Sequence, residues 1–110
     1  MTTVKAIIDK CTMQSVHEVR HITDEYGEFV VFNTGMEELT KVFVDLLGAP
    51  QKPAGVKPSD DDLTLTEGYG GIRINQTLFK RVFEDFILVA MYWPWEDGVR
   101  TTVKMAHLRK

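Results

Sequence analysis

Residues 86–95 read FILVAMYWPW, an uncharged stretch that holds both tryptophans of this 110-residue chain. In a β-strand, successive side chains point to opposite faces of the sheet, so a strand here would have two apolar faces. A small antiparallel sheet usually leaves one of its faces in water. The stretch therefore predicts either a central strand that is covered on both sides or a surface that a second copy of the chain completes.

Length and composition indicate a single globular domain over residues 1–110. A chain of this size can bury about 65% of its unfolded surface without disulfides or metals. Its hydrophobic content of 44% and charged content of 26% are ordinary for a folded protein. The net charge is −3, and basic residues gather only at the C-terminal end, which is too little for a nucleic-acid surface. No apolar stretch reaches the roughly 20 residues of a membrane-spanning helix. We therefore expect neither nucleic acid nor a membrane as a partner.

Cys11 is the only cysteine, so it cannot form a disulfide within the chain. An oxidising compartment is therefore not indicated. The N-terminal residues also lack the apolar segment of a secretory signal, because Asp9 and Lys10 follow directly after two isoleucines. A cytoplasmic location is the expectation.

The first third of the chain predicts a helix followed by a hairpin. Apolar residues spaced three and four apart favour a helix over 3–13. Strands are expected at 15–23 and 28–33, because β-branched and aromatic residues flank a turn that opens at Asp24 and closes at Gly27.

The clearest local signature predicts a helix over about 35–47. Thr34 and Glu37 have the spacing of a capping box, in which a hydroxyl and a carboxylate satisfy the free amides at the start of a helix. Gly48 supplies the left-handed residue that ends it, and Pro50 prevents its resumption.

The middle of the chain is rich in proline, glycine and aspartate. An exposed loop is expected at 49–62, because it shows no apolar periodicity. Two short strands are expected at 63–66 and 72–74, on either side of a glycine turn. Asn75 is then expected to cap a helix, with an apolar face made of Leu78, Phe79, Val82, Phe83 and Phe86.

The end of the chain predicts two long strands. The stretch at 86–94 ends at Pro94, residues 96–98 turn the chain, and 99–107 alternate apolar and polar residues. The whole pattern indicates an α+β domain, in which a mainly antiparallel sheet of about four to six strands packs with two or three helices.

Residues 17–21 read HEVRH, which resembles the signature of zinc peptidases over these five positions. The resemblance implies that His17 and His21 would bind zinc and that Glu18 would activate the metal-bound water. Two histidines four residues apart can share an ion on a helix. On the strand expected at 15–23 they would lie about 13 Å apart at the usual rise per residue. We therefore favour no metal and no cofactor, and a zinc-dependent hydrolase is the alternative function.

Three other groups of residues could indicate an enzymatic or binding function. The glycines at 67–71 lack the spacing of a phosphate loop, because Arg73 occupies the last glycine position. The aspartates at 60–62 lack the glycine and glutamate of a calcium loop, since Leu65 and Gly71 stand at those positions. An enzyme with scattered acid–base residues would use His17, Glu18, His21 and His107.

The aromatic end of the long strand is the strongest candidate for a functional surface. Tryptophan and tyrosine are enriched where proteins bind one another. Aromatic side chains also contribute most of the buried area of a core, so a purely structural role for this group is the other interpretation. The candidate residues are Met91, Tyr92, Trp93 and Trp95. We therefore expect a small non-enzymatic module that forms a dimer and binds a protein partner or an apolar small ligand through an aromatic-rich sheet.

Overall fold

The computed structural model describes residues 16–23 and 25–109. The expected helix at 3–13 lies outside these residues. The elements follow the chain as β1 (Val16–Ile22), β2 (Tyr26–Phe32), the 3-10 turn η1 (Asn33–Gly35), α2 (Met36–Leu47), α3 (Asp60–Thr66), the 3-10 turn η2 (Glu67–Tyr69), β3 (Thr77–Val82), β4 (Phe86–Pro94) and β5 (Arg100–Arg109).

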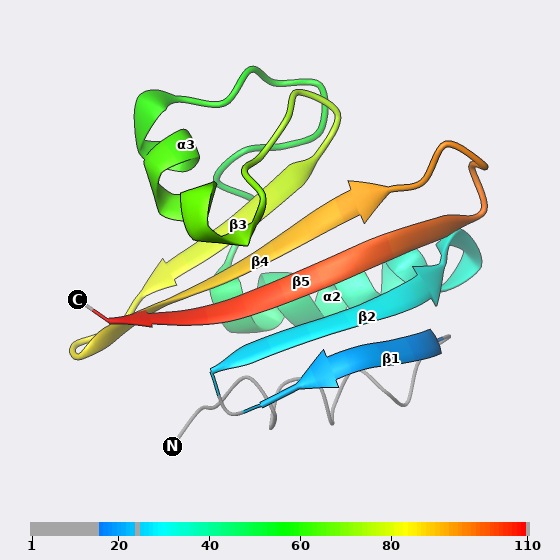
Figure 1. Ribbon diagram of the computed structural model, residues 1–110, viewed down its shortest axis with the longest axis horizontal. Coiled ribbons are helices and arrows are strands. Elements are labelled where there is room, and N and C mark those ends of the chain that lie inside the picture. Colours follow the sequence, from blue (N-terminus) through cyan, green and yellow to red (C-terminus); the bar gives the residue numbers. More distant parts are fainter. Residues whose placement is uncertain (1–15, 24, 110) are drawn as a thin grey trace.

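The five strands form one antiparallel sheet in the order β1-β2-β5-β4-β3. Helix α2 crosses one face of the sheet, and the segment that carries α3 lies over the other face beside β3 and β4 (Figure 1). This arrangement confirms the predicted α+β domain with a mainly antiparallel sheet. We call residues 53–76, which contain α3 and η2, the α3 layer.

Strand β4 is covered on both faces by its own chain. Leu88, Ala90 and Tyr92 belong to the apolar cluster under α2. Val89 and Met91 belong to a second cluster under the α3 layer. The strand is therefore of the sandwiched kind that its sequence allowed, and one copy of the chain supplies both coverings.

Helix α2 matches its prediction in extent and differs in how it begins. Gly48, with φ of 85°, ends the helix as expected. At the start, Thr34 lies inside η1, and the N-cap is Gly35, which makes no capping bond with a side chain. The predicted capping box of Thr34 and Glu37 is therefore wrong, because the tight turn of η1 moves the helix start past Thr34. The buried residues of the helix are Leu39, Phe43 and Leu47.

The capping box of this protein occurs instead at α3. The Ser59 hydroxyl accepts a hydrogen bond from the Asp62 amide at 3.1 Å, and the Ser59 amide donates to the Asp62 carboxylate at 3.0 Å. The predicted loop therefore ends at Ser59 rather than at residue 62. It is also not exposed throughout, since Lys52 is buried and pairs with Leu78. The strands expected at 63–66 and 72–74 do not form, since the first is the end of α3 and the second is irregular.

The helix expected from Asn75 is instead strand β3. Leu78 and Phe79 are both fully buried, and they lie in clusters on opposite faces of the sheet. Adjacent residues on opposite faces are typical of a strand. The spacing of the apolar residues also fitted a helix, and the pairing of β3 with β4 decided between the two.

The remaining strands follow their predictions. The hairpin of β1 and β2 forms as expected, although β2 begins at Tyr26, two residues earlier than predicted. Gly98, with φ of 68°, lies in the turn before β5. Residues 101, 103 and 105 are buried as the predicted alternation requires, and residues 102 and 106 on the opposite face are buried as well. Within the described residues, no helix has the length and apolar character needed to cross a membrane.

Candidate functional site

The histidines of the zinc-peptidase pattern lie on an edge strand. His17, Glu18 and His21 all belong to β1, where four residues span about 13 Å. The Glu18 carboxylate accepts a hydrogen bond from Arg20 Nε at 3.1 Å. No group of three potential metal ligands occurs among the described residues. The motif therefore lacks the helical spacing on which its chemistry depends.

The scattered acid–base residues do not converge either. His107 belongs to the set of β5 residues that alternates toward α2, and its ring stacks on Phe86 with centroids 4.2 Å apart. Glu18 bonds Arg20, whose guanidinium lies over Trp95 on the opposite face of the sheet. The sheet therefore separates His107 from Glu18, while the His21 ring lies 5.9 Å from that of Tyr26.

The two glycine- and aspartate-rich motifs have local structural roles. Gly70, with φ of 96°, lies so close to Trp93 that a Cβ at this position would be 2.4 Å from the indole ring. Asp62 caps α3, while Asp60 and Asp61 are exposed. The glycines thus allow a close turn rather than a phosphate cradle.

The four aromatic-strand candidates divide into core and surface. Met91 is fully buried and Tyr92 is 8% exposed, and the Tyr92 hydroxyl is 2.9 Å from Thr40 Oγ1 of α2. The expectation that these two residues form a binding surface is corrected, because the two layers cover them. Trp93 and Trp95 are half-buried, and Trp93 lies against Gly70 of the α3 layer.

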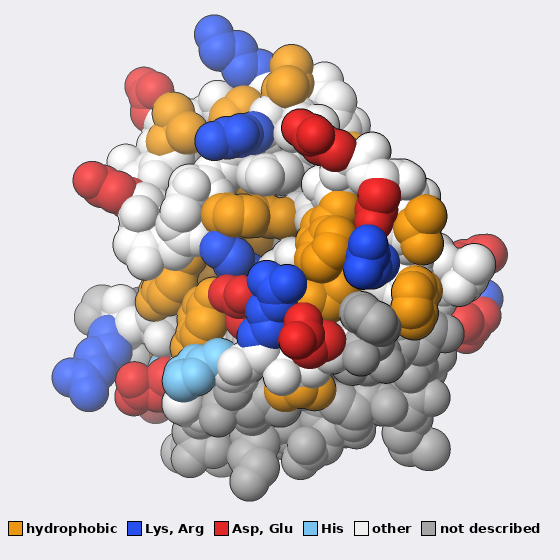
Figure 2. All heavy atoms as spheres, turned by 45° about the vertical axis from the view of Figure 1, so that its right-hand side comes forward, with side chains coloured by type: hydrophobic (Ala, Val, Ile, Leu, Met, Phe, Trp, Pro, Cys, Tyr) orange, Lys and Arg blue, Asp and Glu red, His pale blue; other side chains and the backbone are white. Residues whose placement is uncertain are grey.

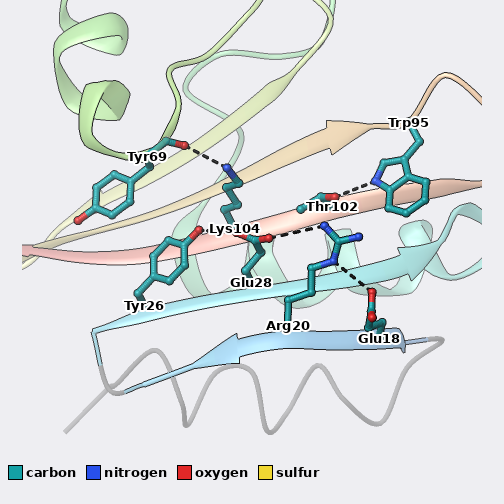
Figure 3. Close-up of polar contacts among 8 residues, drawn as sticks. All are labelled: Glu18, Arg20, Tyr26, Glu28, Tyr69, Trp95, Thr102 and Lys104. Carbon is teal, nitrogen blue, oxygen red and sulfur yellow. Dashed lines mark hydrogen bonds and ion pairs between the residues drawn. The ribbon is translucent and has the colours of Figure 1, made fainter.

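The part of the sheet face that the α3 layer leaves uncovered carries polar and aromatic side chains from β1, β2 and β5 and from Trp95, which follows β4 (Figure 3). We call this surface the open face. It consists of Glu18, Arg20, Tyr26, Glu28, Trp95, Arg100, Thr102 and Lys104.

Trp95 is the central aromatic residue of the open face. Its indole Nε1 donates a hydrogen bond to Thr102 Oγ1 at 2.7 Å. The guanidinium carbons of Arg100 and Arg20 lie 4.5 Å and 5.5 Å from its ring centroid. Cation–π contacts of this kind hold an indole in one orientation. Trp95 is therefore positioned by its neighbours while part of its ring stays accessible.

A second aromatic group joins the open face to the α3 layer. Lys104 Nζ lies 3.4 Å from the ring centroid of Trp93 and donates to the Tyr69 carbonyl at 3.2 Å. The rings of Tyr26 and Tyr69 stack with centroids 5.6 Å apart. Burial lowers the pKa of Lys104, and the charge of Glu28 opposes that effect. The layer thus supplies one border of the surface.

Glu28 links the two groups. Its carboxylate accepts a hydrogen bond from the Tyr26 hydroxyl at 2.8 Å, and it lies 3.9 Å from Arg20 Nη1. Burial, followed by the hydrogen bond and the negative charge of Glu28, raises the pKa of the Tyr26 hydroxyl well above its ordinary range. Tyr26 therefore stays protonated and donates at neutral pH.

Charges of both signs are mixed on this side of the molecule. Figure 2 shows acidic and basic side chains interspersed with apolar ones there. Arg20, Arg100 and Lys104 are matched by Glu18 and Glu28, together with Asp97, which lies 2.8 Å from Arg100 Nη2. Such a balanced surface favours neither a strongly acidic nor a strongly basic partner.

No pocket is found within the described part of the chain. Sequence reasoning did not single out Glu28, Thr102 or Lys104. Alternation in β2 and β5 places these three residues on the face opposite α2, so the strand register could have found them.

Comparison of the chain with protein-family models, with curated proteins and with solved structures finds no match.

Proposed function

We propose that this protein is a non-enzymatic interaction module that self-associates through its open face. The observation that carries the proposal is Trp95, a half-buried indole with the guanidiniums of Arg20 and Arg100 against its ring, on the part of the sheet that the α3 layer does not cover. Tryptophan, tyrosine and arginine are the residues that contribute most to binding energy at protein interfaces. All three occur together on this surface.

The mixed charges support a second copy as the partner. The open face has three basic and two acidic groups, and Asp97 lies beside it against Arg100, so it can meet a copy of itself with opposite charges opposed. A different protein with a similarly balanced surface would use the same residues. An apolar small ligand is less favoured, because the aromatic rings of this face have charged neighbours. We place the module in the cytoplasm, because Cys11 has no partner in the chain for a disulfide.

The proposal is tested by light scattering at several protein concentrations. We expect the mass of a dimer, falling toward that of a monomer on dilution. A Trp95→Ala change should weaken association by about tenfold or more, the range of an interface hot spot, while the melting temperature changes little.

Ile74→Ala is the matched control, since Ile74 is 56% exposed and lies on the α3 layer. This variant should associate like the wild type. A constant monomer mass would contradict self-association, and a Trp95→Ala chain that unfolds would show that Trp95 belongs to the core instead.

A further inference from the structure

The α3 layer leaves the sheet and returns to it at a single narrow neck. Lys52 and Leu78 form an isolated antiparallel bridge, in which each amide bonds the carbonyl of the other at 3.1 Å and 2.9 Å. The layer between them is bonded to itself, for example from the Gly71 amide to the Thr66 carbonyl at 2.9 Å. It therefore has the organisation of a separate structural unit.

The ammonium group of Lys52 closes this neck from the inside. Lys52 is only 1% exposed. Its Nζ donates to the carbonyls of Pro53 at 3.1 Å, Ile74 at 3.2 Å and Gln76. These acceptors come from the first residue of the layer and from its last turn. An ammonium has three donors, so all of them are used here and the two ends of the layer are tied together.

Few hydrogen bonds attach the layer to the sheet outside the neck. Within the described part of the chain, the hydrogen bond from Lys104 to the Tyr69 carbonyl is the one found between the layer and a strand. Ile72 is the one hydrophobic side chain of the layer that is fully buried. Leu65 and Tyr69 pack partly buried against the same cluster, while Leu63, Val56 and Ile74 stay exposed. Regions with few buried apolar contacts open at lower free energy than the core.

We infer that the α3 layer opens from the sheet as a unit while the sheet and α2 stay folded, and that Lys52 is the lock that holds it closed. The buried ammonium of Lys52 has its three hydrogen bonds only while the carbonyls of Pro53, Ile74 and Gln76 stay together. The two ends of the layer therefore separate together or not at all. Opening uncovers the second apolar cluster, including Leu78, Val89 and Met91. It also removes Tyr69 from the border of the open face.

Native-state hydrogen exchange tests this inference on the full chain. At low urea concentrations, the exchange rates of the Leu63 and Gly71 amides should increase less steeply with urea than the exchange rates of the β2 and β5 amides. A weaker dependence on urea means that the opening exposes less surface. Lys52→Met should speed exchange of the layer amides at least tenfold while the strand amides change less than threefold. Lys57→Met, which removes an exposed lysine of the same layer, should leave both groups of amides unchanged.

The comparison of layer and strand amides in the wild-type protein tests the inference even if the Lys52→Met variant fails to fold. Equal urea dependence for layer and strand amides would overturn the inference, as would a Lys52→Met chain that exchanges equally faster everywhere. Ile72→Ala gives a second test, because it loosens the layer without touching the neck and should also act on the layer amides alone. None of these measurements requires the protein to self-associate.

Discussion

The two layers that cover the sheet are attached by different physical means. On one side, α2 buries Leu39 and Phe43 completely against the sheet, and the Phe43 ring lies 5.5 Å from that of Phe79. On the other side, the α3 layer and its neck bury mostly polar groups. These are Lys52, Asp62, Thr66 and Gln76, with Ile72 as the buried apolar residue of the layer.

Because α2 buries apolar side chains and the α3 layer buries polar groups, the two layers contribute to stability in different ways. Burial of apolar side chains contributes about 25 cal/mol per Å² and depends little on exact orientation. Buried hydrogen bonds contribute only about 1 kcal/mol each, but a lost partner leaves a costly unsatisfied group. We therefore expect α2 to hold the fold together and the α3 layer to adopt a well-defined but separable structure.

The largest expected effect is on the α2 side. Phe43→Ala should lower the free energy of unfolding by about 3 to 5 kcal/mol, because it removes a fully buried ring and leaves a cavity. Urea denaturation measures the loss. Val44→Ala is the control on the same helix, since Val44 is 40% exposed, and it should change stability by less than about 0.5 kcal/mol. A similar loss for both variants would show that α2 is not the main support.

An intermediate effect is expected where the α3 layer meets Trp93. Gly70 and Gly71 have φ of 96° and 80°, so alanine at either position costs about 1 to 2 kcal/mol in the backbone. Only the Gly70→Ala side chain meets the indole, at 2.4 Å, whereas Gly71 has nothing within 4 Å. Gly70→Ala should therefore destabilise the protein by at least about 1 kcal/mol more than Gly71→Ala.

The two glycine variants are compared by urea denaturation and by the fluorescence of Trp93. Equal losses would mean that the layer can shift away from the indole without cost. That outcome would make the contact between layer and sheet looser than the structure shows.

The smallest expected effect is a response of the α3 layer to acid. Burial opposes ionisation of Asp62, but hydrogen bonds from Ser59 and Gln51 and the charge of Lys52 outweigh it and lower its pKa. A lowered pKa means that Asp62 stabilises the fold above its unfolded value near pH 4. This stabilisation is lost as the pH falls through the folded pKa. The contribution should be less than about 1 kcal/mol, as for other helix caps.

Asp62→Asn and Asp61→Asn separate this effect from general acid denaturation. The change in urea midpoint between pH 5 and pH 3 should shrink in Asp62→Asn, because the titrating cap is gone. It should match the wild type in Asp61→Asn, since Asp61 is exposed. The idea fails if the two variants behave alike.

Local sequence patterns predicted the elements that have one dominant signal. Helix α2 has an apolar stripe and a terminating glycine, and the hairpin of β1 and β2 has a turn between β-branched runs. The error at β3 has a physical cause. Leu78 and Phe79 are adjacent apolar residues that a helix could place on one side, but two covered sheet faces can also accommodate them.

The open face was predictable only in part. Trp93 and Trp95 were recognised from their residue type, and both are half-buried. Met91 and Tyr92 belong to the same end of the strand, and Tyr92 is also aromatic, but each is covered by one of the layers. Which residues of an aromatic strand stay accessible depends on the segment that crosses above it, and here that segment is remote in sequence.

By itself, the sequence determined that a strand with two apolar faces runs near the end of the chain, because alternation along a strand follows from the geometry of the backbone. Only the tertiary structure decided what covers each face: α2 on one side, and on the other a polar layer tied at Lys52. The reason is that burial depends on which distant segments meet. Which segments meet depends on the order of the strands in the sheet. It also depends on hydrogen bonds, such as those of Lys52, that leave no periodic pattern in the sequence.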